Sequence, residues 1–115
     1  MSTDADEGRD ELERLRERII ALDEELVRLI GERRDLALRI GELKAGLGLP
    51  VLDPAREARV VRRAAERARA LGVDEEMARD VLWRIISSAR AVQEARPAGW
   101  PERPPAGEGT PGSAE

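Results

Sequence analysis

Residues 11–45 read ELERLRERIIALDEELVRLIGERRDLALRIGELKA, and this stretch decides the fold. Its apolar positions recur at alternating intervals of three and four, with position 33 as the one polar member of the series. They are Leu12, Leu15, Ile19, Leu22, Leu26, Leu29, Leu36, Ile40 and Leu43. This is the spacing of a heptad seam, and it predicts one continuous helix from about residue 9 to residue 45.

A helix of this length needs a partner along its whole apolar seam. At 1.5 Å per residue it would be about 55 Å long, which is more than the remaining residues of the chain can cover. A second copy of the chain is therefore the expected cover. The predicted fold is all-α, with three helices per chain, one of them very long, in an intertwined helical-bundle homodimer.

The rest of the chain predicts two shorter helices and a tail. Residues 45–50, AGLGLP, indicate a loop, and Asp53-Pro54 is a typical helix start. The second helix is expected to end near Ala70 with Gly72 as its cap, and the third to run from Asp74 to about Arg96. Residues 97–115 hold five of the seven prolines, so they are predicted to be disordered, as are residues 1–8. The predicted domain is residues 9–96.

The composition limits the chemistry. Of 115 residues, 38% are charged, and there is no His, Cys, Phe or Tyr. The most common general base and the most reactive nucleophile are therefore missing, and no disulfide or thiolate metal site is expected. The net charge of -4 disfavours nucleic acid as a partner, and no apolar run suits a membrane span or a signal peptide. We expect a cytoplasmic protein whose chemistry depends on placed charges.

Several polar residues occupy positions where the pattern calls for apolar ones. Arg33 takes the next place in the heptad series: it either reaches solvent on its long stem or is a buried cation that awaits an anion. Lys44 projects from nearly the same face, with its Cα about 16 Å away, or simply favours the C-terminal end of the helix. Gln93 continues the stripe of Leu82, Ile86 and Ala89, unless the third helix frays there.

Two further features fit a small anionic ligand but also have ordinary explanations. Arg16 lies about 25 Å before Arg33 along one helix, so a small ligand can touch both only if the two come from different chains of an antiparallel dimer. On its own, Arg16 would be a solvated surface residue. Asp53, Arg56 and Glu57 cluster in one turn, as capping residues with a surface ion pair also do.

These residues together resemble the all-helical (AroQ) class of chorismate mutases. The resemblance covers about residues 11–95. It is carried by Leu15-Arg16-Glu17-Arg18-Ile19 with Ala21-Leu22-Asp23, Glu32-Arg33-Arg34, Ile40-Gly41-Glu42-Leu43-Lys44, Pro50-Val51-Leu52-Asp53-Pro54-Ala55-Arg56-Glu57, Ile85-Ile86 and Gln93. Each motif is loose alone, but all of them occur in order at compatible spacings.

The resemblance implies roles for the polar residues. Arg33 matches an arginine that binds a substrate carboxylate, and Arg16 matches one that reaches into the partner chain's site to bind the other. Lys44 and Gln93 match the pair that hydrogen-bonds the ether oxygen of the enolpyruvyl bridge. Lys44, Gln93 and Arg33 are expected to carry catalysis, and all four residues to bind the substrate.

The resemblance also implies a ring subsite, with one departure. Glu57, with the backbone near Asp53, matches the contact to the ring hydroxyl, and Arg56 matches a further site arginine. Ala89 stands where many members have a serine that contacts a carboxylate. Ser88 is adjacent, but one residue is about 100° around a helix, so that contact is expected to be absent or made by water.

The implied reaction converts chorismate to prephenate, an isomerisation in the shikimate pathway toward aromatic amino acids. No metal or organic cofactor is implied. One alternative is a sibling enzyme that acts on 4-amino-4-deoxychorismate or cleaves isochorismate. Another is a non-catalytic coiled-coil interaction module, in which Arg33 would face solvent.

Overall fold

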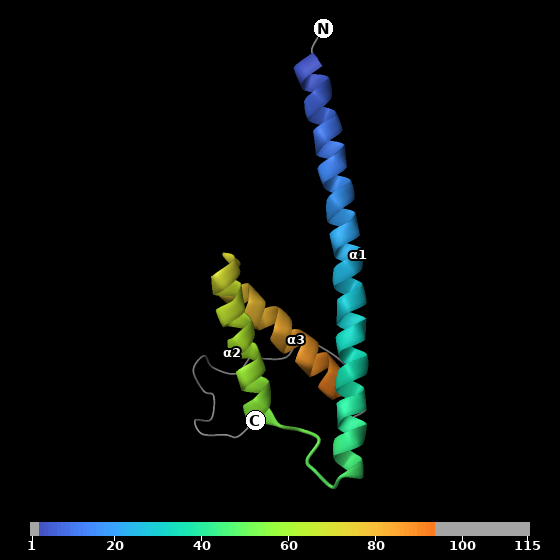
Figure 1. Ribbon diagram of the computed structural model, residues 1–115, viewed down its shortest axis with the longest axis vertical. Coiled ribbons are helices and arrows are strands. Elements are labelled where there is room, and N and C mark those ends of the chain that lie inside the picture. Colours follow the sequence, from blue (N-terminus) through green and yellow to red (C-terminus); the bar gives the residue numbers. More distant parts are fainter. Residues whose placement is uncertain (1–2, 94–115) are drawn as a thin grey trace. The chain divides into compact units, whose positions relative to one another are not determined.

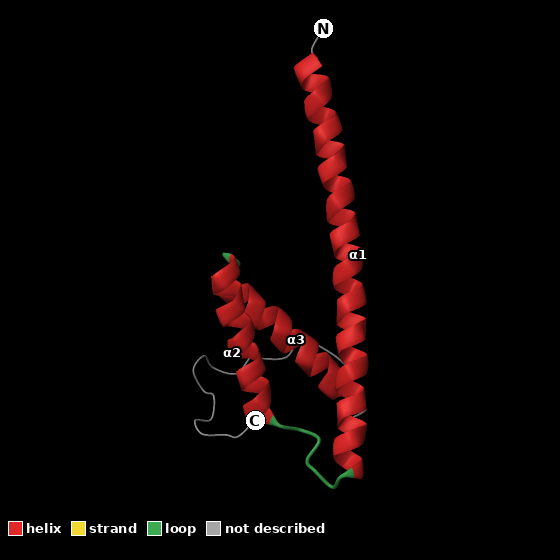
Figure 2. Ribbon diagram, in the orientation of Figure 1, coloured by secondary structure: helices red, strands yellow, loops and turns green. Residues whose placement is uncertain are grey.

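The computed structural model describes residues 3–93, all three of whose elements are helices (Figures 1 and 2). They are α1 (Thr3–Gly46), α2 (Pro54–Leu71) and α3 (Glu75–Gln93). The prediction of an all-α chain with one very long helix is therefore confirmed. The chain divides into two compact units, residues 1–35 and 36–115, and α1 contributes to both.

The described part of the first unit is a single stretch of α1. The helix begins at Thr3, so residues 3–8 are helical where the sequence predicted disorder up to residue 8. The physical reason lies in the first turn, where Asp4 and Asp6 stand next to the positive end of the helix dipole. Acidic composition indicated disorder, but carboxylates at this end of a helix stabilise it.

The heptad positions of α1 form an exposed apolar stripe in the single chain. The stripe consists of Leu12, Leu15, Ile19, Leu22, Leu26, Leu29, Leu36, Ile40 and Leu43, whose exposed fractions lie between 46% and 61%. The sides of α1 carry ion pairs one turn apart, such as Arg28 with Glu25 and, at 2.8 Å, with Glu32. An apolar stripe flanked by charges is typical of a helix that packs against another helix.

The ends of α2 match the predicted caps. Asp53 Oδ1 accepts a hydrogen bond from the Arg56 backbone N–H at 3.1 Å, and Pro54 is the first helical residue. Gly72 has φ 71°, a left-handed conformation that glycine adopts without strain. Its N–H donates to Arg69 O at 3.2 Å, and the Val73 N–H donates to Ala68 O at 2.8 Å. These bonds satisfy two carbonyls in the last turn of α2, where the chain turns toward α3.

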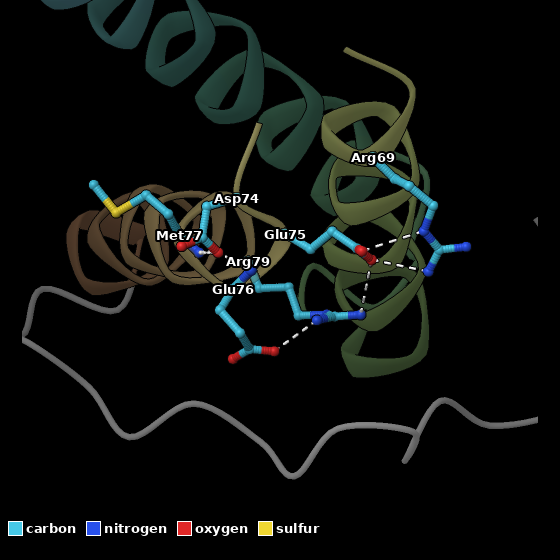
Figure 3. A network of polar contacts seen from close by, with 6 residues as sticks. All are labelled: Arg69, Asp74, Glu75, Glu76, Met77 and Arg79. Atoms are coloured by element: carbon cyan, nitrogen blue, oxygen red, sulfur yellow. Dashed lines mark hydrogen bonds and ion pairs between the residues drawn. The ribbon is translucent and has the colours of Figure 1, made fainter. Parts of the chain in front are cut away.

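A small polar network holds the turn between α2 and α3 (Figure 3). Asp74 caps α3 by accepting from the Glu76 and Met77 N–H groups at 2.9 and 3.2 Å. Arg69 of α2 reaches Glu75 of α3 with two hydrogen bonds, at 2.9 and 3.2 Å. The guanidinium beside Glu75 lowers the pKa of that carboxyl. The network fixes how α3 leaves the turn.

The core of the second unit lies between α2 and α3 and is made mostly of small residues. The buried apolar residues are Val61, Ala65, Ala68, Ile86, Ala89 and Ala91. Alanines let two helices approach closely but bury little apolar area. Among residues 3–93, no large side chain is fully buried. One chain therefore gains little stability from its own core.

Two sequence predictions lie outside the described residues: the continuation of the third helix to Arg96 and the Pro/Gly-rich tail at 97–115. Within residues 3–93, none of the helices combines the length and apolar character that crossing a bilayer requires.

Candidate functional site

Gln93 stands at the end of α3 and binds back to α1. Its Nε2 donates a hydrogen bond to the Ala37 carbonyl oxygen at 3.3 Å. Gln93 is exposed rather than buried. The amide is thus held at a defined place on α1 while remaining accessible to a ligand.

Gly41 leaves the space that this amide occupies. It is the one residue of α1 that is buried, and a Cβ at this position would lie 2.6 Å from Gln93 Nε2 and 3.6 Å from Val51 Cγ1. The first separation is too short for a real contact. A glycine here allows the Gln93 side chain to lie directly against the backbone of α1.

Lys44 follows Gly41 by three residues, so the two lie on neighbouring parts of one helix face. Lys44 is partly buried, in the last turn of α1, where a cation suits the negative end of the helix dipole. Its carbonyl oxygen accepts from the Leu47 and Leu49 N–H groups at 3.1 and 2.8 Å. The face of α1 that contacts Gln93 therefore also carries Lys44.

The first turn of α2 presents the Asp53, Arg56 and Glu57 cluster. Asp53 is engaged as the N-cap, and Arg56 is exposed. The Glu57 carboxylate forms an ion pair with Arg90, near the end of α3. The Asp53 side chain therefore caps the helix, whereas Glu57 pairs with a residue distant in sequence.

The sequence did not single out Arg90. Its side chain is 23% exposed, and its guanidinium lies 6.0 Å from the centroid of the Trp83 ring, a cation–π distance. Its Nε is buried and has no hydrogen-bond partner in the part of the chain that the structure describes. The sequence offered only a charged residue in the last turn of α3, since its pairing with Glu57 depends on how α2 and α3 pack.

Ala89 is buried, with 7% of its surface exposed, and the neighbouring Ser88 is only partly covered. Ala89 therefore belongs to the small-residue core between α2 and α3. Its methyl group offers no hydrogen bond, so a ligand near this position would meet an apolar surface.

Arg16 and Arg33 belong to the first unit. Arg16 is exposed, and its Nη1 lies 4.0 Å from Oε2 of Glu13, one turn earlier in the helix. Arg33 is partly buried, and its burial lowers the pKa of its guanidinium. Arg33 is therefore neither fully buried nor fully exposed in one chain. The other predicted site residues, Lys44, Asp53, Arg56, Glu57, Ala89 and Gln93, all belong to the second unit.

A helical chain that carries placed cations and an amide, without His or Cys, suits a protein that binds and orients an anion. Comparison with known families identifies the family of anion-binding proteins to which the chain belongs. The model of the family described as chorismate mutase type II matches residues 15–94, and the chain belongs to this family. The matched region contains every predicted site residue.

Several curated proteins are similar to this chain. The T-protein of Enterobacter agglomerans is 38% identical over 76 residues, which are 66% of this chain and 20% of that protein. A chorismate mutase of Methanocaldococcus jannaschii is 31% identical over 85 residues, 74% of this chain and 86% of that protein. A 4-amino-4-deoxychorismate mutase of Streptomyces venezuelae is 36% identical over 84 residues, 73% and 82% of the two chains.

The relatives differ in length. The chain spans 20% of the T-protein but most of the Methanocaldococcus and Streptomyces proteins. No solved structure matches the chain.

Proposed function

We propose that this protein is a chorismate mutase, which rearranges chorismate to prephenate. The observation that carries the proposal is the family match over residues 15–94, a region that includes every residue predicted for the site. The similarity to a chorismate mutase along 86% of that protein's length supports the same activity.

The proposed chemistry suits the residues present. The rearrangement is intramolecular: one C–O bond breaks while one C–C bond forms, and neither a base nor a nucleophile is needed. Negative charge grows on the ether oxygen as the C–O bond breaks. Lys44 and Gln93 would donate hydrogen bonds to that oxygen, and donors already held in place stabilise such a charge without reorganisation. The hydrogen bond from Gln93 to Ala37 is a means of holding the amide.

The arginines would hold the substrate in its reactive shape. Arg33 and Arg56 would bind from one chain, and Arg16 from the other, so that both carboxylates are gripped by charge-assisted hydrogen bonds. The partial burial of Arg33 supports this role, because a desolvated guanidinium gains more from a carboxylate than a solvated one.

Glu57 and the backbone near Asp53 would contact the ring hydroxyl of the substrate. Ala89 would line the site without a hydrogen bond, and water would take the place of the serine hydroxyl that many members have there. No metal or organic cofactor takes part in the proposed reaction.

The proposed protein is a homodimer in which α1 helices of two copies pack along their apolar stripes. The exposure of all nine stripe residues and the small alanine core of one chain support this assembly. The dimer would also bring Arg16 of the second copy to the site. Arg16 and Arg33 of one chain are about 25 Å apart along α1, so one small ligand cannot touch both. A cytoplasmic location stays a prediction from composition.

The direct test is to incubate the purified protein with chorismate and follow the loss of its absorbance while identifying the product. We expect prephenate, at a rate unchanged by a metal chelator. An Arg28→Ala variant, altered only at an exposed ion pair of α1, serves as a matched control and should keep full activity. Salicylate from isochorismate, or no turnover of chorismate, would contradict the proposal.

A further inference from the structure

An ion pair links the start of α2 to the end of α3 at the proposed ring subsite. Glu57 lies in the first turn of α2 and Arg90 in the last turns of α3, and their side chains are 17% and 23% exposed. Partial burial shields the two charges from water and salt, so each strongly affects the potential at the other. The carboxylate is therefore electrically compensated before any ligand binds.

Compensation changes what Glu57 can attract. A carboxylate has about four lone-pair positions, so Glu57 can accept a further hydrogen bond while it holds Arg90. A neutral hydroxyl donates that bond without a charge of its own. A ligand ammonium would be attracted by Glu57 but repelled by the Arg90 guanidinium beside it, and the two effects largely cancel.

We infer that Arg90 sets the preference of the ring subsite for a neutral hydroxyl over a cationic amine. The inference rests on the proposed function, in which Glu57 contacts the ring substituent. Arg90 acts through Glu57 as a positioning and specificity-determining residue. The substrate class is then the 4-hydroxy compound chorismate, and 4-amino-4-deoxychorismate, whose amine is largely protonated near neutral pH, is disfavoured.

Trp83 supports this role by restricting the guanidinium. The Arg90 Cζ atom lies 6.0 Å from the centroid of the Trp83 ring, so the cation is held between an aromatic face and a carboxylate. Trp83 stands on α3 two turns before Arg90, on the same side of the helix. An arginine held in this way keeps its charge next to Glu57 when a ligand arrives.

The test compares two substrates in three proteins. We measure kcat/KM for chorismate and for 4-amino-4-deoxychorismate in the wild type, in Arg90→Met and in Arg90→Lys. The wild type should prefer chorismate. Arg90→Met removes the positive charge at similar side-chain length and should shift the ratio of the two values toward the amine by about tenfold or more, as one nearby charge does. Arg90→Lys keeps the charge and should keep the ratio.

A matched control is Arg79→Met on the same helix. Arg79 is also an ion-paired arginine of low exposure, 26%, but it pairs with Glu75 and Glu76 in the first turn of α3. Its replacement should leave the ratio unchanged. If Arg90→Met does not fold by circular dichroism, Arg90→Gln provides a second neutral replacement.

The outcomes separate the inference from the proposed function. Wild-type protein that converts neither substrate would overturn the proposed function and the inference with it. Activity on chorismate with an unchanged ratio in the neutral Arg90 variant would overturn the inference alone, because a merely structural role lowers both values equally. A wild-type preference for the amine would overturn the inference and would also favour the 4-amino-4-deoxychorismate alternative over the proposed function.

Discussion

At the scale of single residues, the Gln93 amide lies against Gly41, where a side chain would leave it no room. A methyl group at position 41 would lie 2.6 Å from Gln93 Nε2. The atom that must move is the end of a flexible side chain, so relief is possible without a change in the backbone. Function and stability should therefore respond differently to this substitution.

We predict that Gly41→Ala keeps the fold but lowers activity. Alanine is the better helix former by about 1 kcal/mol, which offsets the cost of moving Gln93. The displaced amide would no longer face the ether oxygen, and kcat should fall by about 10²-fold or more, as it does when one oriented donor is lost. Thermal melting and kcat together check the prediction. Gly31→Ala is the control, since a Cβ there meets nothing within 4 Å. Normal activity in Gly41→Ala would show that activity does not depend on the contact between Gly41 and the Gln93 amide.

We predict that Lys44→Ala removes most turnover while leaving the helices intact. The loss of a donor to a developing negative charge costs roughly 3–4 kcal/mol, or about 10²–10³ in rate. Steady-state kinetics with chorismate give the rate, and far-ultraviolet circular dichroism gives the helix content. Near-normal activity in this variant would exclude Lys44 from the mechanism.

The sequence allowed some of these residue-level features to be predicted and not others. Gln93 could be singled out because it is a polar residue at the next position of an apolar stripe, and Asp53 because it precedes a proline at a helix start. The pairing of Glu57 with Arg90 could not, because it joins residues 33 positions apart and depends on how α2 and α3 pack. The roles of all the predicted site residues in binding and catalysis stay predictions.

At the scale of the helices, ends marked by a capping residue were easier to predict than the start of α1, which has no such mark in the sequence. The end of α2 at Leu71, next to Gly72, follows from local chemistry that four or five residues contain in full. The start of α1 at Thr3 does not, because charged residues suit both a solvated helix and a disordered segment. Only the favourable placement of Asp4 and Asp6 at the helix start separates the two.

The apolar stripe of α1 leads to a prediction about assembly. Wild-type protein at micromolar concentration should sediment at about twice the chain mass of 12.7 kDa. Leu22→Asp should sediment as a monomer or unfold, because it would place two carboxylates, one from each copy, within an apolar interface. Val27→Asp is the matched control: Val27 is an exposed apolar residue of α1 that lies outside the stripe, and its replacement should leave the dimer intact. A folded wild-type monomer would contradict the shared site.

At the scale of the whole molecule, the proposed site can be tested by mixing two inactive variants. Arg16→Ala and Arg33→Ala should each be nearly inactive. If each site takes Arg16 from one chain and Arg33 from the other, a mixed dimer collects both substitutions in one site and neither in the other. Random exchange makes about half the dimers mixed, so roughly a quarter of wild-type activity should return.

Chain exchange must be shown independently in this experiment, for example with copies of different mass. No recovery after confirmed exchange would mean that both arginines serve one site from one chain. The two stripe-bearing copies would then still form a dimer, but its sites would be separate.

The contact between Trp83 and Arg90 has a practical consequence. The chain contains two tryptophans and no tyrosine or phenylalanine, so its ultraviolet emission comes from two indoles alone. Replacement of Trp100 would leave Trp83 as the single fluorophore, next to the guanidinium of Arg90. Its emission would then report the polarity around that cation, and a bound ring would alter the signal. Ligand binding could thereby be followed by fluorescence without a label.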